Sequence, residues 1–410
     1  MKKSSTASLA AALLLLTACT HSNQQISTTP PEEQLANSVI AYSMSTDYRS
    51  AGGLENNPGG SILFYNPDTK TWTDVATDGM EHSRLTYRDQ TLYYADYQTD
   101  YALTPKGLTT AEHQDHQAPR IPLMFSIPQD RGGGMVALAN QGSEDDGSGY
   151  LWDIIVTQGN KRTVHPLEHY IGYAAQCEDG SVWGWSNPYL TSNTSDYGAA
   201  NAPQQILQLY PDFKPDPVAT IEHEHRYSTG NSLDCADGVL YYIIDNYKPE
   251  VTDPYGGGPD DFDGSSLVSY DTRTGIFDKR DINGDWAIRS TDEMWNSELI
   301  YRHIYQGGLY WISGSGDLVR TDLKTAHNTK ILTLQGYDIE TESPGLIAFE
   351  GPYLFHSIPR FGRDTDFYRY NLTTGEMESH AKLPDYKNVD KKYQFPSAMV
   401  ITNLDKALKL

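Results

Sequence analysis

The chain has 410 residues and a formal net charge of −23 at pH 7, with 54 acidic residues against 31 basic ones. A surface this acidic repels phosphate backbones and anionic headgroups, which argues against nucleic acid as a partner. The chain holds 29 tyrosines, 34 glycines and 22 prolines. No long stretch has helical periodicity, so we expect an all-β protein built from short strands and turns.

The N-terminus has the layout of an export signal. Met1-Lys2-Lys3 is basic, and an apolar run rich in Ala and Leu follows from Ala7 to Leu16. The run has roughly half the length that a membrane-spanning helix needs. We therefore expect residues 1–18 to be a signal peptide that is removed during export.

The end of this segment, Leu16-Thr17-Ala18-Cys19, resembles the lipobox of bacterial lipoproteins, in which the cysteine receives the lipid. The resemblance covers only the first 19 residues. It implies a membrane anchor at Cys19; the alternative is an ordinary secreted protein with a chance cysteine at this position. Thr20 follows instead of Asp, which resembles lipoproteins that Gram-negative bacteria send to the outer membrane. We thus expect an envelope protein that is lipid-anchored in the outer membrane.

The residues after Cys19 predict a tether followed by one folded domain. Thr20 to Asn37 is polar, contains Pro30-Pro31 and has no apolar periodicity, so it cannot bury enough surface to fold. We therefore expect residues 19–37 to be a lipidated cysteine with a flexible spacer, and residues 38–410 to form a single domain.

An internal repeat predicts the architecture of that domain. One form is a hairpin with an alternating strand, a Tyr-Asn or Tyr-Asp pair, a polar turn with Thr, and a second strand, and it occurs at Ser61–Val75, Ser266–Phe277 and Phe367–Met377. Looser copies occupy 150–166, 206–221 and 318–332. Short polar side chains suit such turns because they cap the turn amides.

A second form precedes each hairpin and consists of an apolar strand, a short turn and a strand rich in Tyr or Trp. Copies lie at 87–94, 177–185, 235–242, 305–311 and 349–355, and 127–138 supplies one more. Two strand pairs together make a four-stranded unit of the size of a propeller blade. These six interior pairs, with a seventh assembled from Phe395–Thr402 and Ser38–Ser45, predict a seven-bladed β-propeller closed by its N- and C-terminal strands.

The alternative is a six-bladed propeller in which Tyr97 to Gly149 is an insertion, because 98–119 makes a poor outer hairpin.

The hairpin Tyr65–Trp72 is similar to the outer strands of kelch repeats, and the whole arrangement looks like kelch-like or TolB-like propellers. The Gly-Gly pair of a full kelch unit is absent after Tyr93-Tyr94. The resemblance therefore implies the fold alone, since propellers host unrelated functions.

Candidate metal-binding residues are scattered along the sequence, and no group of them makes a complete set of ligands. His223 and His225 alternate with glutamates, but no third ligand sits at a telling spacing, so a solvated edge strand is the better interpretation. For the same reason His113 and His116 are interpreted as part of a surface loop. His303 and His356 lie on or beside apolar strands and are interpreted as hydrogen-bonded core or channel histidines.

Two acidic clusters are interpreted as loops. Asp260–Gly264 could hold calcium but lacks the ligand pattern of an EF-hand, and Glu144–Gly147 is weaker still. We find no phosphate loop, no nucleophile elbow and no metalloprotease motif. We therefore predict no catalytic residue, no metal site and no cofactor, and we expect acidic groups in turns to keep pKa values near normal.

Cys177 and Cys235 are the cysteines that remain beside Cys19. Both occupy the same place, Cys-x-Asp-Gly, in successive units, and the expected compartment is oxidising. We predict that they form a disulfide. The geometric alternative is that neighbouring inner strands stay beyond the Cα distance of about 7 Å that a disulfide spans.

Two classes of function fit these observations. The first is a binding or scaffold lipoprotein whose loops hold a protein or glycan partner; Trp183, Trp185 and Trp311 suit such surfaces, although strand residues of this kind also pack between blades. The second is an envelope hydrolase or lyase that acts on carbohydrate in the central channel. The absence of catalytic motifs favours binding, and the sequence predicts no oligomeric state.

We predict that Cys19 carries the lipid, because the lipobox match stands directly after the apolar run. Mass spectrometry of the mature N-terminus should find acylated Cys19. An unmodified N-terminus that starts elsewhere would refute the prediction.

Overall fold

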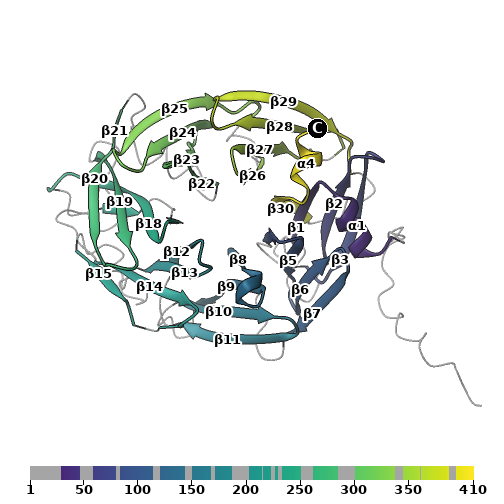
Figure 1. Cartoon of the computed structure of the whole chain (residues 1–410), viewed down its shortest axis with the longest axis horizontal. Coiled ribbons are helices and arrows are strands. Elements are labelled where there is room, and N and C mark those ends of the chain that lie inside the picture. Colours follow the sequence, from purple (N-terminus) through teal and green to yellow (C-terminus); the bar gives the residue numbers. More distant parts are fainter. Residues whose placement is uncertain are drawn as a thin grey trace, which may run out of the picture.

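The strands form seven antiparallel sheets arranged as blades around a central axis (Figure 1). The structure is a computed structural model. It describes residues 29–46, 59–79, 84–113, 121–143, 150–167, 171–186, 203–214, 216–222, 227–229, 233–250, 262–284, 301–337, 345–360, 362–386 and 394–410.

Each blade runs from an innermost strand at the axis to an outermost strand at the rim. Blade 1 contains β30 (Gln394–Ile401), β1 (Ile40–Thr46), β2 (Gly60–Asn66) and β3 (Thr71–Thr77). Blade 2 contains β4 (Leu85–Arg88), β5 (Thr91–Ala95), β6 (Thr99–Thr104) and β7 (Gly107–Glu112). Blade 3 contains β8 (Leu123–Ile127), β9 (Gly134–Ser143), β10 (Tyr150–Gln158) and β11 (Lys161–Leu167), with the short helix η2 (Gln129–Arg131) between β8 and β9. Blade 4 contains β12 (Ile171–Gln176), β13 (Val182–Ser186), β14 (Gln204–Tyr210) and β15 (Ala219–Ile221).

The other three blades continue the ring. In blade 5 the inner edge is shared by β16 (Tyr227–Thr229) and β17 (Asp234–Ala236), which both pair with β18 (Val239–Tyr247), and β19 (Phe262–Asp271) and β20 (Phe277–Asp281) follow. Blade 6 contains β22 (Arg302–Tyr305), β23 (Gly308–Ile312), β24 (Asp317–Asp322) and β25 (His327–Thr333), and β21 (Asn283–Gly284) pairs with β25 in parallel. Blade 7 contains β26 (Leu346–Glu350), β27 (Tyr353–Ile358), β28 (Thr365–Asn371) and β29 (Glu376–Leu383).

The seven-bladed prediction is confirmed, and the six-bladed alternative is wrong. The stretch that looked like an insertion holds the outer hairpin β6–β7 of blade 2 and the beginning of blade 3. The hairpin belongs to the core because Leu103 and Ala111 are buried, with exposed fractions of 0% and 2%. Its polar neighbours, many of them threonines, had hidden this alternation.

The turns of four outer hairpins are capped in the same way. Asn66, Asp271, Asp322 and Asn371 each accept the backbone N–H groups two and three residues ahead through one side-chain oxygen. In blade 7, for example, Asn371 Oδ1 accepts from Thr373 at 2.8 Å and from Thr374 at 3.2 Å. Three of these turns begin at the Tyr-Asn or Tyr-Asp pairs of the repeat, whereas in the fourth Asp322 follows Thr321.

The ring closes where the two ends of the propeller meet. β1 pairs with β30 from Ile40 opposite Ile401 to Thr46 opposite Gln394. The closure is reinforced toward blade 7, because Trp72 Nε1 of β3 donates to the Pro384 carbonyl at 2.8 Å and its ring packs against Tyr42 and Tyr386. This arrangement places β1 between β2 and β30, so β1 has no open edge and β30 forms the inner edge of the blade.

The expected flexible spacer is wrong for its last part. Residues Pro31–Asn37 form the helix α1, in which Leu35 and Gln34 are buried with exposed fractions of 3% and 5%. Leu35 packs with core residues of blades 1 and 2, such as Ile62 and Leu92. A proline at the helix start and two glutamates in the first turn favour this short helix. The helix α1 docks on the core through Leu35, and a single leucine gives no apolar periodicity from which a helix could be predicted.

The lipid-anchor prediction concerns residues outside the described part of the chain, because Cys19 and residues 1–28 are not among the described residues. Within the described part, no helix has the length and apolar character that crossing a bilayer requires. A second short helix, α4 (Leu404–Ala407), follows β30, and its neighbours Leu408 and Leu410 pack against the core between blades 1 and 7.

Removal of residues 395–410 is expected to unfold the domain. The deletion strips the inner strand from blade 1 and exposes the apolar faces beside it. Thermal melting followed by circular dichroism should show no cooperative transition near that of the intact protein. The single substitution Ile401→Ala keeps the strand and should cost about 2 to 5 kcal/mol, so this control should still fold. A truncated protein that melts cooperatively at the intact temperature would contradict the closure.

Candidate functional site

A groove runs over the turn ends of blades 4, 5 and 6. Its volume is about 610 Å³, and its polar lining includes Glu178, Asp237, Tyr241, Arg280, Gln306 and Lys324. These residues come from the β12–β13 turn, the β17–β18 turn, the β22–β23 turn, the β24–β25 turn and the strands β18 and β20. The groove therefore exists only when three blades stand side by side.

One wall of the groove is held by a covalent link between blades. Cys177 and Cys235 are joined by a disulfide, with their Cα atoms 4.9 Å apart. Glu178 follows Cys177 directly, and its two carboxylate oxygens accept the backbone N–H of Asp237 at 3.0 and 2.9 Å. The inner edges of blades 4 and 5 are thus fixed to each other at the point where the groove begins.

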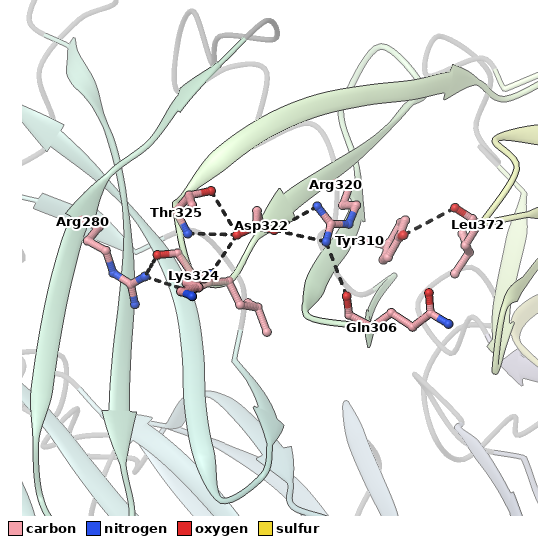
Figure 2. A network of polar contacts seen from close by, with 9 residues as sticks. Arg280, Gln306, Tyr310, Arg320, Asp322, Lys324, Thr325 and Leu372 are labelled. Carbon is pink, nitrogen blue, oxygen red and sulfur yellow. Dashed lines mark hydrogen bonds and ion pairs between the residues drawn. The ribbon is translucent and has the colours of Figure 1, made fainter.

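The opposite wall is held by a polar network (Figure 2). Asp322 Oδ1 accepts from the backbone of Lys324 at 3.0 Å and from the backbone and hydroxyl of Thr325 at 2.9 and 3.0 Å. Asp322 Oδ2 accepts from Arg320 at 3.3 Å, and Arg320 also donates to the Gln306 carbonyl at 3.5 Å. The network therefore couples the two turns of blade 6 that border the groove.

Arg280 connects this wall to blade 5. Figure 2 shows its guanidinium reaching from β20 toward the turn of blade 6, where Nη1 donates to the carbonyl of Leu323 at 3.0 Å and to that of Lys324. Its Nε pairs with Asp278 at 2.7 Å. One guanidinium therefore links blades 5 and 6 at this side of the groove.

The groove carries charges of both signs around a tyrosine. Burial raises the pKa of Tyr241, Arg280 acts against this shift, and Asp237 and Asp271 reinforce it. Tyr241 therefore keeps its proton and offers a hydroxyl that both donates and accepts. With carboxylates on one wall and Arg280 and Lys324 on the other, the groove suits hydrogen bonding to a polar polymer or peptide.

A second polar cluster lines the inner strands of blades 4 to 6. Arg302 of β22 pairs with Asp234 of β17 at 2.5 Å, donates to the Leu233 carbonyl at 2.5 Å, and lies over the ring of Tyr173 on β12 at 5.8 Å. Burial raises the pKa of Asp234 to about 6, although the Arg302 charge acts in the opposite direction. Arg302, Asp234 and Tyr173 lie far apart in the sequence, so no sequence motif could predict this cluster.

A half-buried carboxyl, that of Glu350, lies at the end of the inner strand β26 of blade 7. Burial raises the pKa of Glu350 to about 7, and its charge in turn raises the pKa of Tyr87 on β4, beyond the effect of that ring's own burial. Ordinary pKa values were expected for acidic groups in turns, but Asp234 and Glu350 lie on the inner strands β17 and β26 and have raised pKa values. Inner strands that converge on the axis desolvate these groups, which the sequence does not reveal.

The predictions made for the individual histidines differ in their outcomes. His113 is not part of a surface loop, because its side chain is buried and its Nε2 lies 2.9 Å from Asp100 Oδ1. His303 stacks on Phe349, burial lowers its pKa, and its Nε2 lies 3.0 Å from the Gly351 carbonyl. His356 is fully buried in β27. His116, His223 and His225 lie outside the described residues, as do residues 144–147, 260 and 261.

The tryptophans pack between blades. Trp183, Trp185 and Trp311 have exposed fractions of 7%, 4% and 1%, so none offers a surface for a partner. In the described part of the chain, no group of three or more His, Cys, Asp or Glu side chains is arranged to hold a metal ion.

A family model, the YycP beta-propeller domain, matches residues 38–401 of the chain. None of the curated proteins matches. Among solved structures, a puromycin hydrolase is similar with a TM-score of 0.49 and 12% identity, covering 89% of this chain and 57% of that one. A mutant of the Synechocystis apocarotenoid oxygenase has a TM-score of 0.47 and 9% identity, covering 91% and 93%. A putative 6-phosphogluconolactonase from Bacteroides uniformis has a TM-score of 0.42 and 12% identity, covering 89% and 99%.

The native protein, purified without reductant, is expected to show no reactive thiol at Cys177 or Cys235. Both cysteines are consumed by the disulfide, and Cys177 is almost fully buried. Thiol labelling under denaturing conditions, before and after reduction, should detect the two groups only after reduction. Labelling of both residues without reductant would contradict the cross-link.

Replacement of Glu350 by Gln is expected to stabilise the protein at high pH. The folded-state pKa of Glu350 is raised from 4.5 to about 7, so the folded protein loses stability from this group as pH rises through that window. Above pH 7 the variant should gain about 1 to 3 kcal/mol over the parent, and below pH 4.5 the two should match. Urea unfolding against pH measures this, with Glu376→Gln on exposed β29 as the control that should change nothing. If the free energies of unfolding of Glu350→Gln and its parent change with pH in parallel, the result would contradict the raised pKa of Glu350.

Proposed function

The chain belongs to the family of the YycP beta-propeller domain, and from this premise we propose that it is a membrane-anchored binding or scaffold lipoprotein of the cell envelope. Its propeller would hold a protein or glycan partner. The lipobox of the sequence supports the anchor at Cys19. An anchor would confine the propeller to a layer near the membrane and raise its effective concentration for a large partner.

The groove over blades 4 to 6 is the observation that carries this proposal. Its volume of about 610 Å³ lies within the range of ligand sites in proteins. Its walls are fixed by a disulfide and by Arg280, so a partner would find a preformed surface and would not have to order it. Glu178, Asp237 and Lys324 present charges of both signs at the rim, which favours a partner with mixed polar groups.

Lys324→Glu is expected to weaken partner binding by about tenfold or more, since it reverses one charge on a wall of the groove. Lys106→Glu is the matched control, because Lys106 occupies the corresponding outer turn of blade 2, away from the groove. The mature lipoprotein and both variants are used to capture partners from envelope membranes and from purified envelope polysaccharides. A partner held equally well by all three proteins would contradict a binding role for the groove.

A second candidate function is an envelope carbohydrate hydrolase or lyase with its site in the channel. The raised pKa of Glu350, about 7, and of Asp234, about 6, favours it, because acid–base catalysis uses groups that titrate near the working pH. Release of reducing ends from envelope polysaccharides tests this function. Turnover by the parent that is abolished in Glu350→Gln would favour the enzyme and contradict the binding proposal.

A further inference from the structure

A second pocket lies between blades 2 and 3 and has no part in the groove. Its volume is about 250 Å³. Its base is buried, with exposed fractions of 1% for Asp100, 4% for Tyr93 and 5% for Thr91, whereas Gln129 and Thr109 at its rim are exposed. The pocket is therefore open at the surface and closed at the bottom.

Residues of two blades line the pocket, and several of them are small. Thr91, Ala102 and Thr109 of blade 2 stand opposite Gly132, Gly133 and Gly134 of blade 3. A Cβ atom on Gly134 would lie 2.2 Å from the Thr157 carbonyl oxygen, and this residue has a φ of +122°, so only glycine fits. Between blades 6 and 7, by contrast, Tyr310 and Tyr370 belong to one closely packed core cluster.

The electrostatics at the base favour an uncharged ligand. The Asp100 carboxylate lines the pocket and already accepts from Thr157 at 2.6 Å, from Arg162 at 3.2 Å and from His113 at 2.9 Å. The guanidinium of Arg162 balances its charge within the same buried network. A charged ligand would therefore lose its hydration without gaining an unpaired counter-charge.

The lining offers groups that both donate and accept hydrogen bonds. Hydroxyls of Thr91, Thr109 and Tyr93 and the amide of Gln129 surround the space, and Tyr93 Oη accepts from the Gly134 N–H at 3.1 Å. Ligand hydroxyls are also donors and acceptors, so they match this lining better than carbonyls or amines alone would. The volume is below that of sites for drug-sized ligands, which are about 300 to 1,000 Å³.

We propose that the pocket between blades 2 and 3 binds one neutral polyol the size of a single sugar ring. None of the residues that line this pocket lines the groove, so the two binding proposals can be tested independently. A polar ring held at the base by hydroxyls and closed in by the glycine wall would be recognised by its hydroxyl pattern and not by charge.

The probes are D-glucose, D-galactose and D-mannose at millimolar concentration, and binding is measured by saturation-transfer NMR on the folded domain. At least one probe is expected to bind the parent. Thr109→Phe should fill the pocket and weaken binding by about tenfold or more. Thr110→Phe is the matched control, because it places the same ring on the adjacent exposed residue of β7, on the other face of the strand, and it should bind as the parent does.

A second variant, Thr91→Val, removes one hydroxyl from the base at nearly constant volume. It should weaken binding several-fold and leave the melting temperature of the free protein close to that of the parent. The proposal is overturned if none of the three sugars binds the parent, or if Thr109→Phe and Thr110→Phe bind equally well. Loss of binding in both Thr109→Phe and Thr110→Phe would also overturn it, because the effect would then not come from the pocket.

Discussion

The pairing of β1 with β30 joins residues that are almost a whole chain apart; Ser38 and Thr402, beside this pair, share a hydrogen bond across 364 positions. The entropy of closing so large a ring grows only with the logarithm of its length. Closure gives every blade two neighbours. The groove over blades 4 to 6 and the pocket between blades 2 and 3 both lie between blades, so neither would exist on a single sheet.

The side chains between two neighbouring blades determine whether their interface is closely packed or contains a pocket. Tyr370 fills the space between blades 6 and 7, and Phe355 fills the space between blades 7 and 1. Where glycines and threonines stand in those positions, as in blades 2 and 3, the same packing leaves a pocket. The repeat thus provides a uniform frame, on which the residues at the blade interfaces and in the turns differ from one blade to the next.

The parts of the structure that could be predicted from the sequence are those with local or repeated causes. The capped turn at Asn371 and the strand pairs follow from residues within one hairpin, and the disulfide follows from equal positions in successive repeats. The contact of Arg162 with Asp100 spans 62 positions, and the ion pair of Arg302 with Asp234 joins two blades. Neither has a spacing that a motif could record, because the ring geometry alone brings them together.

The closure of the ring is tested most directly by amide hydrogen exchange. We expect the paired amides of β1 and β30 to exchange as slowly as those of β18 and β19, because opening either pair requires unfolding the whole ring. Exchange across β1 and β30 that is much faster, while β18 and β19 stay protected, would show that the ring opens at its seam and would contradict the dependence of the whole fold on this closure.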